Sequence, residues 1–220
     1  MPRRRLERAN DCPYHVTLRV NNREPFPIPL QKMWRILNQE IFFVQVLFGT
    51  RFHAVVLMPN HIHLLLTVPE ADLGIVMNQF VSNLTRQTHL RSGRSGRLFG
   101  QRYHSSIIKT SRYYGHALKY VYRNPVKAKL SRSVENYPYS SLAGLFGKHA
   151  LQCSIHHPPR GFDAELPWER REPSELLPWL NESYSEEIDR LIGLGMKRSV
   201  FDELKDRTTR RPYEQLTRLV

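Results

Sequence analysis

The feature that most constrains the fold is a pair of apolar runs joined by a turn. Residues 52–58 and 61–68 are both rich in aliphatic and β-branched side chains, and the Pro-Asn pair between them is a typical turn. The second run is apolar almost throughout, apart from His61 and His63. A strand without a polar face lies in the middle of a sheet. The sequence therefore predicts two adjacent strands, the second of them central and carrying both histidines.

Further elements surround this strand pair. The apolar spacing predicts a strand at residues 14–20, helices at 30–48, 73–84 and 111–124, and an extended segment at 98–110. Gly49 is placed to end the first helix and Asp72 to cap the second, while Pro125 is expected to end or kink the third. Strand, helix, strand, strand, helix, strand, helix is the split-βαβ order of a ferredoxin-like sandwich. We therefore predict an α+β fold whose antiparallel sheet has helices on one face and is open on the other.

The sequence changes in character after about residue 150. Prolines interrupt residues 151–220, and short helices are predicted at 183–193, opened by a capping box of Ser183 and Glu186, and at 199–205. A length of 220 residues suits one domain with an appendage. We therefore predict a domain at residues 1–150 followed by a mostly helical C-terminal extension at residues 151–220.

Basic charge is concentrated in the first of these two parts. The chain has 33 Lys and Arg against 20 Asp and Glu, a net charge of +13. Residues 1–150 hold 22 of the basic and 7 of the acidic side chains, and residues 73–134 hold 12 Lys or Arg but no Asp or Glu. Ordinary solvated surfaces mix both signs, so this segment favours a polyanionic partner, either a nucleic acid or an anionic membrane surface.

A membrane is the weaker of these two partners. No apolar run approaches the roughly 18 residues that span a bilayer, and no apolar segment follows the basic N-terminus as it does in a secretory signal. Two cysteines, Cys12 and Cys153, are too few for a disulfide framework. We therefore expect a cytoplasmic protein with reduced thiols and no membrane contact.

The two histidines form the first candidate site. His61 and His63 are two apart on a strand, so their imidazoles leave the same face and could hold one divalent cation between them. Neither a cysteine nor a carboxylate lies between Glu40 and Glu70, which disfavours structural zinc. A site with few protein ligands suits a Lewis acid that completes its shell with water and phosphate oxygens. The alternative is a pair of histidines that only pack or hydrogen-bond.

The second candidate site lies on the third predicted helix. Tyr120 and Asn124 are four apart and share a helical face, so a phenol nucleophile and an amide oxygen could converge on one metal-phosphate site. The alternative is structural: Asn124 could cap a new helix beginning at Pro125, and a helical tyrosine commonly belongs to a core.

Five segments carry a pattern that is more specific in combination than singly. In chain order they are residues 14–22, residues 57–65 with a His-hydrophobic-His motif, and residues 96–103, 120–128 and 137–141. Together they resemble the REP-associated tyrosine transposases, a branch of the single-tyrosine HUH transposase (IS200-like transposase) superfamily. The likeness covers roughly residues 13–142 and follows the family's order.

The resemblance implies a metal-dependent transposase that nicks and rejoins single-stranded DNA, with residues 1–150 as its catalytic domain. In such families a tyrosine attacks a phosphodiester, forms a 5′-phosphotyrosine link and frees a 3′-hydroxyl, and no nucleotide cofactor is needed. Carried over, Tyr120 is the nucleophile, with Tyr122 as the alternative. His61 and His63 hold Mg²⁺ or Mn²⁺, and Asn124 stands where related transposases have a longer glutamine ligand. The implied partner is a palindromic, REP-like DNA hairpin, and the implied location is the bacterial nucleoid.

DNA contacts are expected from the stretch that lacks acidic residues, because lysine and arginine bind phosphates and aromatic rings stack on unpaired bases. The predicted DNA-binding residues are Arg91, Arg94, Arg97, Arg102, Tyr103, Lys119, Arg123, Lys127 and Lys129. Three further aromatic side chains could stack or belong to the core, namely Phe99, Tyr113 and Tyr114. An N-terminal arm of Arg3, Arg4, Arg5 and Arg8 is a further candidate.

One rival interpretation is a non-catalytic nucleic-acid-binding module, since ferredoxin-like sheets with exposed aromatic rings also bind RNA. A two-histidine RNA phosphodiesterase is a second rival, but it needs two His-x-Thr or His-x-Ser copies, whereas the candidate histidine pair here is a single His-x-His-Leu motif at His61 and His63. Divalent-metal-dependent cleavage separates the enzyme from the binding module. The sequence leaves open whether the protein acts as a monomer or a dimer.

Overall fold

The computed structural model describes residues 9–162, 173–205, 209 and 211–216. The arginines of the proposed N-terminal arm lie outside these residues. None of the helices in the described part of the chain is long and apolar enough to cross a membrane.

A five-stranded sheet in the order β2-β3-β1-β4-β5 forms the centre of the fold. Its strands are β1 (Tyr14–Arg19), β2 (Arg51–Met58), β3 (His61–Thr67), β4 (His104–Ile108) and β5 (Val200–Phe201). The first four pair antiparallel in ferredoxin-like order, and β5 joins β4 in parallel. This confirms the predicted α+β class and the central position of the histidine strand.

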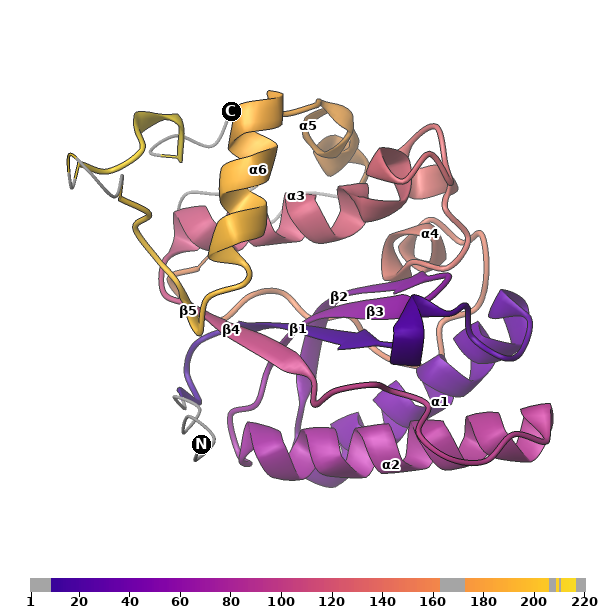
Figure 1. The fold of residues 1–220 in the computed structure, drawn as a ribbon. Helices are drawn as coiled ribbons and strands as arrows, with labels where there is room; N and C mark the ends of the chain where they lie inside the picture. Colours follow the sequence, from indigo (N-terminus) through magenta and orange to yellow (C-terminus); the bar gives the residue numbers. More distant parts are fainter. Residues whose placement is uncertain (1–8, 163–172, 206–208, 210, 217–220) are drawn as a thin grey trace.

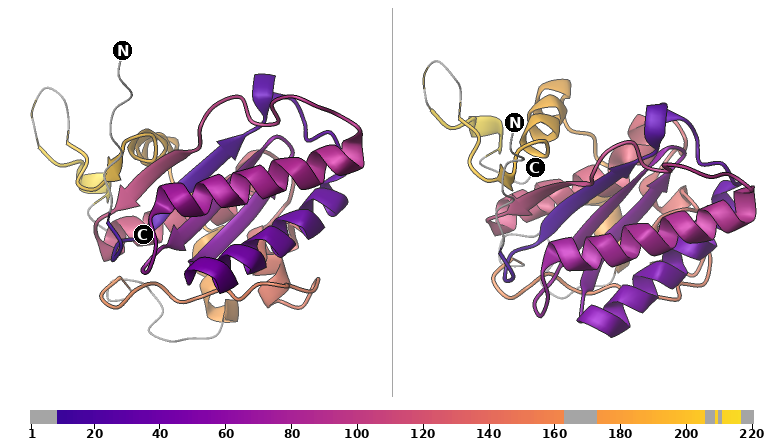
Figure 2. Two further views of the ribbon diagram at one scale, coloured as in Figure 1. Left: turned by 90° about the horizontal axis from the view of Figure 1, so that it is seen from below. Right: turned by 60° about the horizontal axis from the view of Figure 1, so that its bottom comes forward.

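Two long helices cover one face of the sheet. α1 (Leu30–Phe48) and α2 (Leu73–Ser92) lie side by side across it (Figures 1 and 2). They pack on the side chains of β1 and β3 that alternate toward them, among them Val16, Leu18, Ile62 and Leu64. As predicted, Gly49 ends α1 in the left-handed conformation, and the Asp72 carboxylate accepts hydrogen bonds from the first turn of α2.

The opposite face is covered as well, so the prediction of an open face is wrong. α3 (Ser111–Lys127) crosses it, with α4 (Ser141–Leu145) beside β2 (Figure 1). The sheet residues on this side include Ala54, Val56 and Leu65, which are buried against Val121 of α3. A sheet that is apolar on both faces exposes too much apolar surface unless both faces are packed.

α3 also runs past the predicted break at Pro125. The helix continues to Lys127, and the backbone N–H of Ala128 still donates to the Asn124 carbonyl. The ring of Pro125 fits the helical φ, and the missing N–H removes one helical hydrogen bond. Because Pro125 is buried, its packing offsets that loss. Asn124 is therefore inside a helix and does not cap a new one.

Residues 176–196 of the C-terminal extension pack on α3, on the side away from the sheet (Figure 1). Its elements are η3 (Pro173–Leu176), α5 (Leu177–Asn181), α6 (Glu186–Gly195), β5 and η4 (Glu214–Leu216); the short turns η1 (Asn21–Arg23) and η2 (Val134–Asn136) complete the fold. Ser185, and not Ser183, caps α6 by accepting from the Ile188 N–H. The helix predicted at 199–205 is wrong, because β4 offers unpaired backbone groups that β5 occupies.

Candidate functional site

His61 and His63 lie side by side on the face of β3 that α3 covers. Their ring centroids are 4.8 Å apart, as the two-residue period of a strand predicts. His61 Nδ1 is 2.7 Å from the Asn60 side-chain oxygen. Burial lowers the pKa of His61 to about 4 and that of His63 well below its usual value. Both rings are therefore neutral at pH 7, the form in which imidazole binds metals.

A third histidine, not predicted as a site residue from the sequence, lies behind this pair. His15 Nε2 and His63 Nδ1 share a hydrogen bond of 3.0 Å, and the two rings stack. Burial lowers the pKa of His15 to about 3. The pairing of Thr17 with His63 brings His15 to this place. Two-residue periodicity puts His15 on one face of its strand, but only the register between β1 and β3 shows that it is the histidine face.

The Nε2 atoms of His61 and His63 are suited to binding a cation. Among the residues that the structure describes, the buried His63 Nε2 has no hydrogen-bond partner, which is costly for a buried polar atom. In both His61 and His63, Nδ1 is hydrogen-bonded to another side chain, which leaves Nε2 available for a ligand. A metal-bound histidine usually has its second nitrogen fixed in this way. Within the described ranges no cluster of three or more His, Cys, Asp or Glu could hold a metal, so the histidines would share it with other ligands.

Tyr120 comes to the same place from α3. Its ring centroid is 5.8 Å from that of His63 and 6.0 Å from that of His15, edge-on to both. Burial raises the pKa of Tyr120, an effect that the nearby Arg19 guanidinium opposes, so the phenol is protonated at neutral pH. One turn further, the Asn124 side-chain N–H donates to the Tyr120 carbonyl at 2.8 Å, which leaves its Oδ1 as the possible metal ligand.

An ion pair borders the tyrosine on the same helix. Lys127 Nζ lies 5.5 Å from the centroid of the Tyr120 ring. The same ammonium is 3.1 Å from the carboxylate of Asp189 in α6. The extension thus reaches the edge of the site through one carboxylate.

Most of the predicted DNA-binding residues lie at the surface. The exposed ones are Arg91, Arg94, Arg97, Arg102 and Lys129. The Lys127 side chain is partly exposed, and Tyr103 is half-buried beneath the Arg102 guanidinium. Hydrogen bonds from Asn21 to Leu98 and from Gly100 to Arg19 tie the loop before β4 to the end of β1. Because Arg19 pairs with His61, this loop lies at the histidine end of the sheet.

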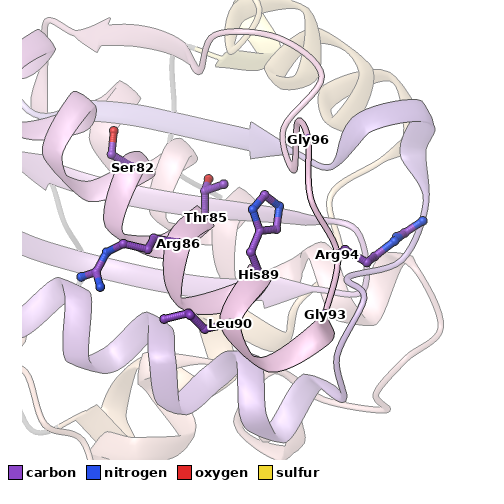
Figure 3. Close-up of a pocket in the computed structure, with 8 residues that line it drawn as sticks. All are labelled: Ser82, Thr85, Arg86, His89, Leu90, Gly93, Arg94 and Gly96. Atoms are coloured by element: carbon purple, nitrogen blue, oxygen red, sulfur yellow. The ribbon is translucent and has the colours of Figure 1, made fainter.

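A second basic feature lies on the far side of the sheet from Tyr120. The C-terminal half of α2 and the loop after it line an open pocket (Figure 3). His89 is directed toward the loop at Gly96, and Arg86 and Arg94 lie at the sides of the pocket. Arg94 also forms an exposed ion pair with Glu24.

Two predicted DNA-binding residues are instead buried beneath the extension. The Lys119 ammonium lies 4.2 Å from the Tyr184 ring centroid and 5.0 Å from that of Trp179, and burial lowers the pKa of Lys119 to about 8. Arg123 donates to the carbonyls of Leu180 and Asn181. These contacts exclude a phosphate from both side chains. Lys119 and Arg123 therefore hold α5 on α3, a role invisible without the tertiary contact.

Several predicted aromatic candidates are buried too. Phe99, Tyr113 and Tyr114 belong to the core and present no face to an unpaired base. Tyr122, the alternative nucleophile, is buried with its hydroxyl 3.0 Å from Ser141 Oγ. Burial raises the pKa of Tyr122, so it does not ionise readily, and its hydroxyl is directed to Ser141 and the His53 carbonyl.

Arg123→Ala is expected to lower the free energy of unfolding by about 2 kcal/mol, because the charged hydrogen bonds to the two α5 carbonyls are lost. Urea denaturation followed by tryptophan fluorescence measures the effect, since Trp179 lies in α5. The matched control is Arg132→Ala, an exposed arginine that should change stability by less than about 0.5 kcal/mol. Equal stability of the two variants would contradict the structural role of Arg123.

Comparison with known proteins identifies relatives of this chain. Residues 8–124 match the family described as "Transposase IS200 like". A protein of Haemophilus influenzae described as a REP-associated tyrosine transposase is 30% identical over 103 residues, which are 40% of this chain and 56% of the relative. The match thus spans little more than half the length of that relative.

One of two aligned solved structures shares the architecture of this chain. A REP-associated tyrosine transposase bound to a REP hairpin aligns with a TM-score of 0.56 and 21% identity, over 71% of this chain and 93% of that one. A transposase structure from Deinococcus radiodurans aligns with a TM-score of 0.38 and 16% identity, over 62% of this chain and 97% of that one. The first of these likenesses indicates a common fold.

Proposed function

This chain belongs to the IS200-like transposase family, and we propose that it nicks and rejoins single-stranded DNA through a 5′-phosphotyrosine intermediate. The observation that carries the proposal is the approach of Tyr120, on α3, to His61 and His63 on β3. Two elements far apart in the sequence bring a phenol and two neutral imidazoles to one point. Of the tyrosines considered as nucleophile, Tyr120 alone is both near the histidines and partly exposed.

The cofactor of this proposal is Mg²⁺ or Mn²⁺. The Nε2 atoms of His61 and His63 and the Oδ1 of Asn124 would hold it, and the unpaired, buried His63 Nε2 supports that assignment. When bound, the ion draws charge from the non-bridging phosphate oxygens and makes the phosphorus more open to attack. Asn124 is one methylene shorter than glutamine, so its ligand role is the least constrained of the three.

The chain's own residues account for the chemical step. The Tyr120 oxygen forms a bond to phosphorus, the bond from phosphorus to the 3′ oxygen breaks, and the proton lost by the phenol is balanced by the one gained at the 3′-hydroxyl. The new ester conserves the energy of the broken one, so the reverse attack by a 3′-hydroxyl reseals the strand without a nucleotide. Burial of Tyr120 favours the protonated phenol, hence proton transfer accompanies or precedes attack.

The substrate proposed is a DNA hairpin formed by an imperfect, REP-like palindrome. The solved structure that aligns with a TM-score of 0.56 is described as a transposase bound to a REP hairpin, which supports this choice. Exposed arginines of the loop before β4 lie at the histidine end of the sheet, where they can bind the phosphates of a strand that enters the site.

Arg97→Gln is expected to weaken binding to a hairpin and to reduce the slope of log K against log salt concentration by about 1, because one phosphate contact and its released counterion are lost. Fluorescence anisotropy at four or more salt concentrations measures the slope. The matched control is Arg35→Gln, an exposed arginine on α1, which should leave the slope unchanged. An unchanged slope for Arg97→Gln would remove this loop from the DNA path.

The function as a whole is tested with labelled single-stranded hairpins incubated with and without Mg²⁺ or Mn²⁺. We expect a covalent protein–DNA adduct that survives denaturing electrophoresis and appears only with the metal. Metal-independent binding without any adduct would instead favour the non-catalytic binding module. That rival needs an open sheet face for base stacking, whereas α3 covers the face that carries the histidines.

A further inference from the structure

We infer that Asp189 of α6 is a positioning residue: its carboxylate holds the Lys127 ammonium beside Tyr120, so that the C-terminal extension completes the site. This inference rests on the proposed function, because it assigns a role in the attack by Tyr120. It gives the extension a purpose in the reaction beyond packing against α3.

The geometry of α3 places Lys127 next to the ring of Tyr120. Tyr120 and Lys127 are seven apart, two helical turns, and therefore lie on one face of the helix. The Lys127 ammonium is 5.5 Å from the centre of the tyrosine ring. A lysine side chain has many rotamers, so in isolation this ammonium would spend much of its time elsewhere.

Asp189 restricts that freedom. Its carboxylate oxygen is 3.1 Å from Lys127 Nζ, and the two side chains are only 20% and 35% exposed, respectively. An ion pair that is partly shielded from water is stronger than one at an open surface. The pair therefore fixes the ammonium over the Tyr120 ring.

α6 is itself firmly placed, so Asp189 is a fixed point. Leu191 and Ile192 bury the inner face of α6 in the core shared with α3. The residue before its cap, Tyr184, has its hydroxyl 2.9 Å from His116 Nδ1 on α3. The cap residue Ser185 accepts from the first turn, which fixes where the helix begins.

The charge distribution argues that this carboxylate has a task. Residues 73–134, which contain Tyr120, include no Asp or Glu, so the extension supplies the negative charge beside the tyrosine. Unpaired, a carboxylate here would repel a DNA phosphate and oppose ionisation of the phenol. Paired with Lys127, it orients a cation beside the Tyr120 ring, although its own charge still raises the pKa of the phenol. It is not part of a metal cluster, because the described residues contain no group of three such ligands.

A fixed ammonium at this place stabilises the attack on phosphorus. Charge builds on the non-bridging phosphate oxygens as the Tyr120 oxygen approaches, and a preorganised donor interacts with it without a reorganisation cost. The contribution is thus to the rate of attack, and much less to the affinity for DNA, which many phosphate contacts share.

The test compares Asp189→Asn with Glu187→Gln, a matched loss of one negative charge at an exposed position of the same helix. Adduct formation is measured in a single turnover at saturating hairpin and Mn²⁺, and affinity is measured separately. We expect Asp189→Asn to form the adduct about tenfold more slowly with affinity within about twofold of the unchanged protein, and Glu187→Gln to match that protein in both. Lys127→Met should show at least the same loss of rate, and adding Asp189→Asn to it should cost nothing more.

A reversed pair separates positioning from simple bridging of the helices. Lys127→Asp combined with Asp189→Lys restores an ion pair between α3 and α6 but removes the ammonium from its place, so thermal stability should recover and the rate should not. An Asp189→Asn rate equal to or above that of the unchanged protein, or full recovery of rate in the reversed pair, would overturn the inference. Absence of an adduct with the unchanged protein would instead refute the proposed function.

Discussion

Tyr120→Phe is expected to abolish nicking and adduct formation, with a loss of at least about ten-thousandfold in rate, while hairpin affinity stays within about twofold. The substitution removes only the attacking oxygen, since the ring keeps its edge-on contacts with His15 and His63. The hydroxyl of Tyr122, the alternative nucleophile, cannot replace it, because it is hydrogen-bonded to Ser141 inside the core. Denaturing gels resolve the adduct, and anisotropy measures the affinity.

Tyr122→Phe is the matched control for this experiment. It also removes one hydroxyl from a tyrosine of α3, and it should lower the free energy of unfolding by about 1 kcal/mol through the lost Ser141 hydrogen bond. Its rate of adduct formation should be that of the unchanged protein. An adduct formed by Tyr120→Phe but not by Tyr122→Phe would identify Tyr122 as the nucleophile and refute the proposed site.

The sequence was sufficient for the parts of the fold and site that depend on local periodicity. The central position of β3 followed from its apolar composition, and the shared face of His61 and His63 followed from the two-residue period of a strand. The same strand also indicates a second covering layer. Apart from its histidines, β3 is largely apolar on both faces of the sheet, so both faces need to be packed. The open face was therefore predicted against a pattern already present in the strand.

Features that depend on tertiary contacts were not predictable in this way. His15 becomes a neighbour of His63 only through the β1–β3 register. Lys119 and Arg123 look like surface cations because their helix is basic in sequence. In the structure α5 covers them, and its Trp179 ring and carbonyl groups are their partners, together with the Tyr184 ring. Asp189 is 69 positions from Tyr120 in the sequence, and no local pattern links them. In each case the determining partner lies on another element.

His63→Ala is expected to lower the affinity for Mn²⁺ more than a hundredfold and to abolish the adduct at micromolar metal, because one of two imidazole ligands is lost. Hairpin affinity without metal should hardly change, since phosphate contacts supply it. Isothermal titration calorimetry or the electron paramagnetic resonance of free Mn²⁺ measures metal affinity without relying on activity. His157→Gln, at an exposed histidine, is the control and should bind Mn²⁺ as the unchanged protein does.

His15→Phe extends the same measurement to the histidine behind the site. The phenyl ring keeps much of the packing against His63 but removes the 3.0 Å hydrogen bond that fixes which nitrogen of His63 carries the proton. We expect Mn²⁺ affinity to fall by about tenfold to a hundredfold, less than for His63→Ala. The loss of Mn²⁺ affinity should be larger for His63→Ala than for His15→Phe, because His63 is a proposed ligand whereas His15 only orients one. Unchanged Mn²⁺ affinity in His63→Ala would show that the pair does not bind the ion, and the unpaired Nε2 would then need another explanation.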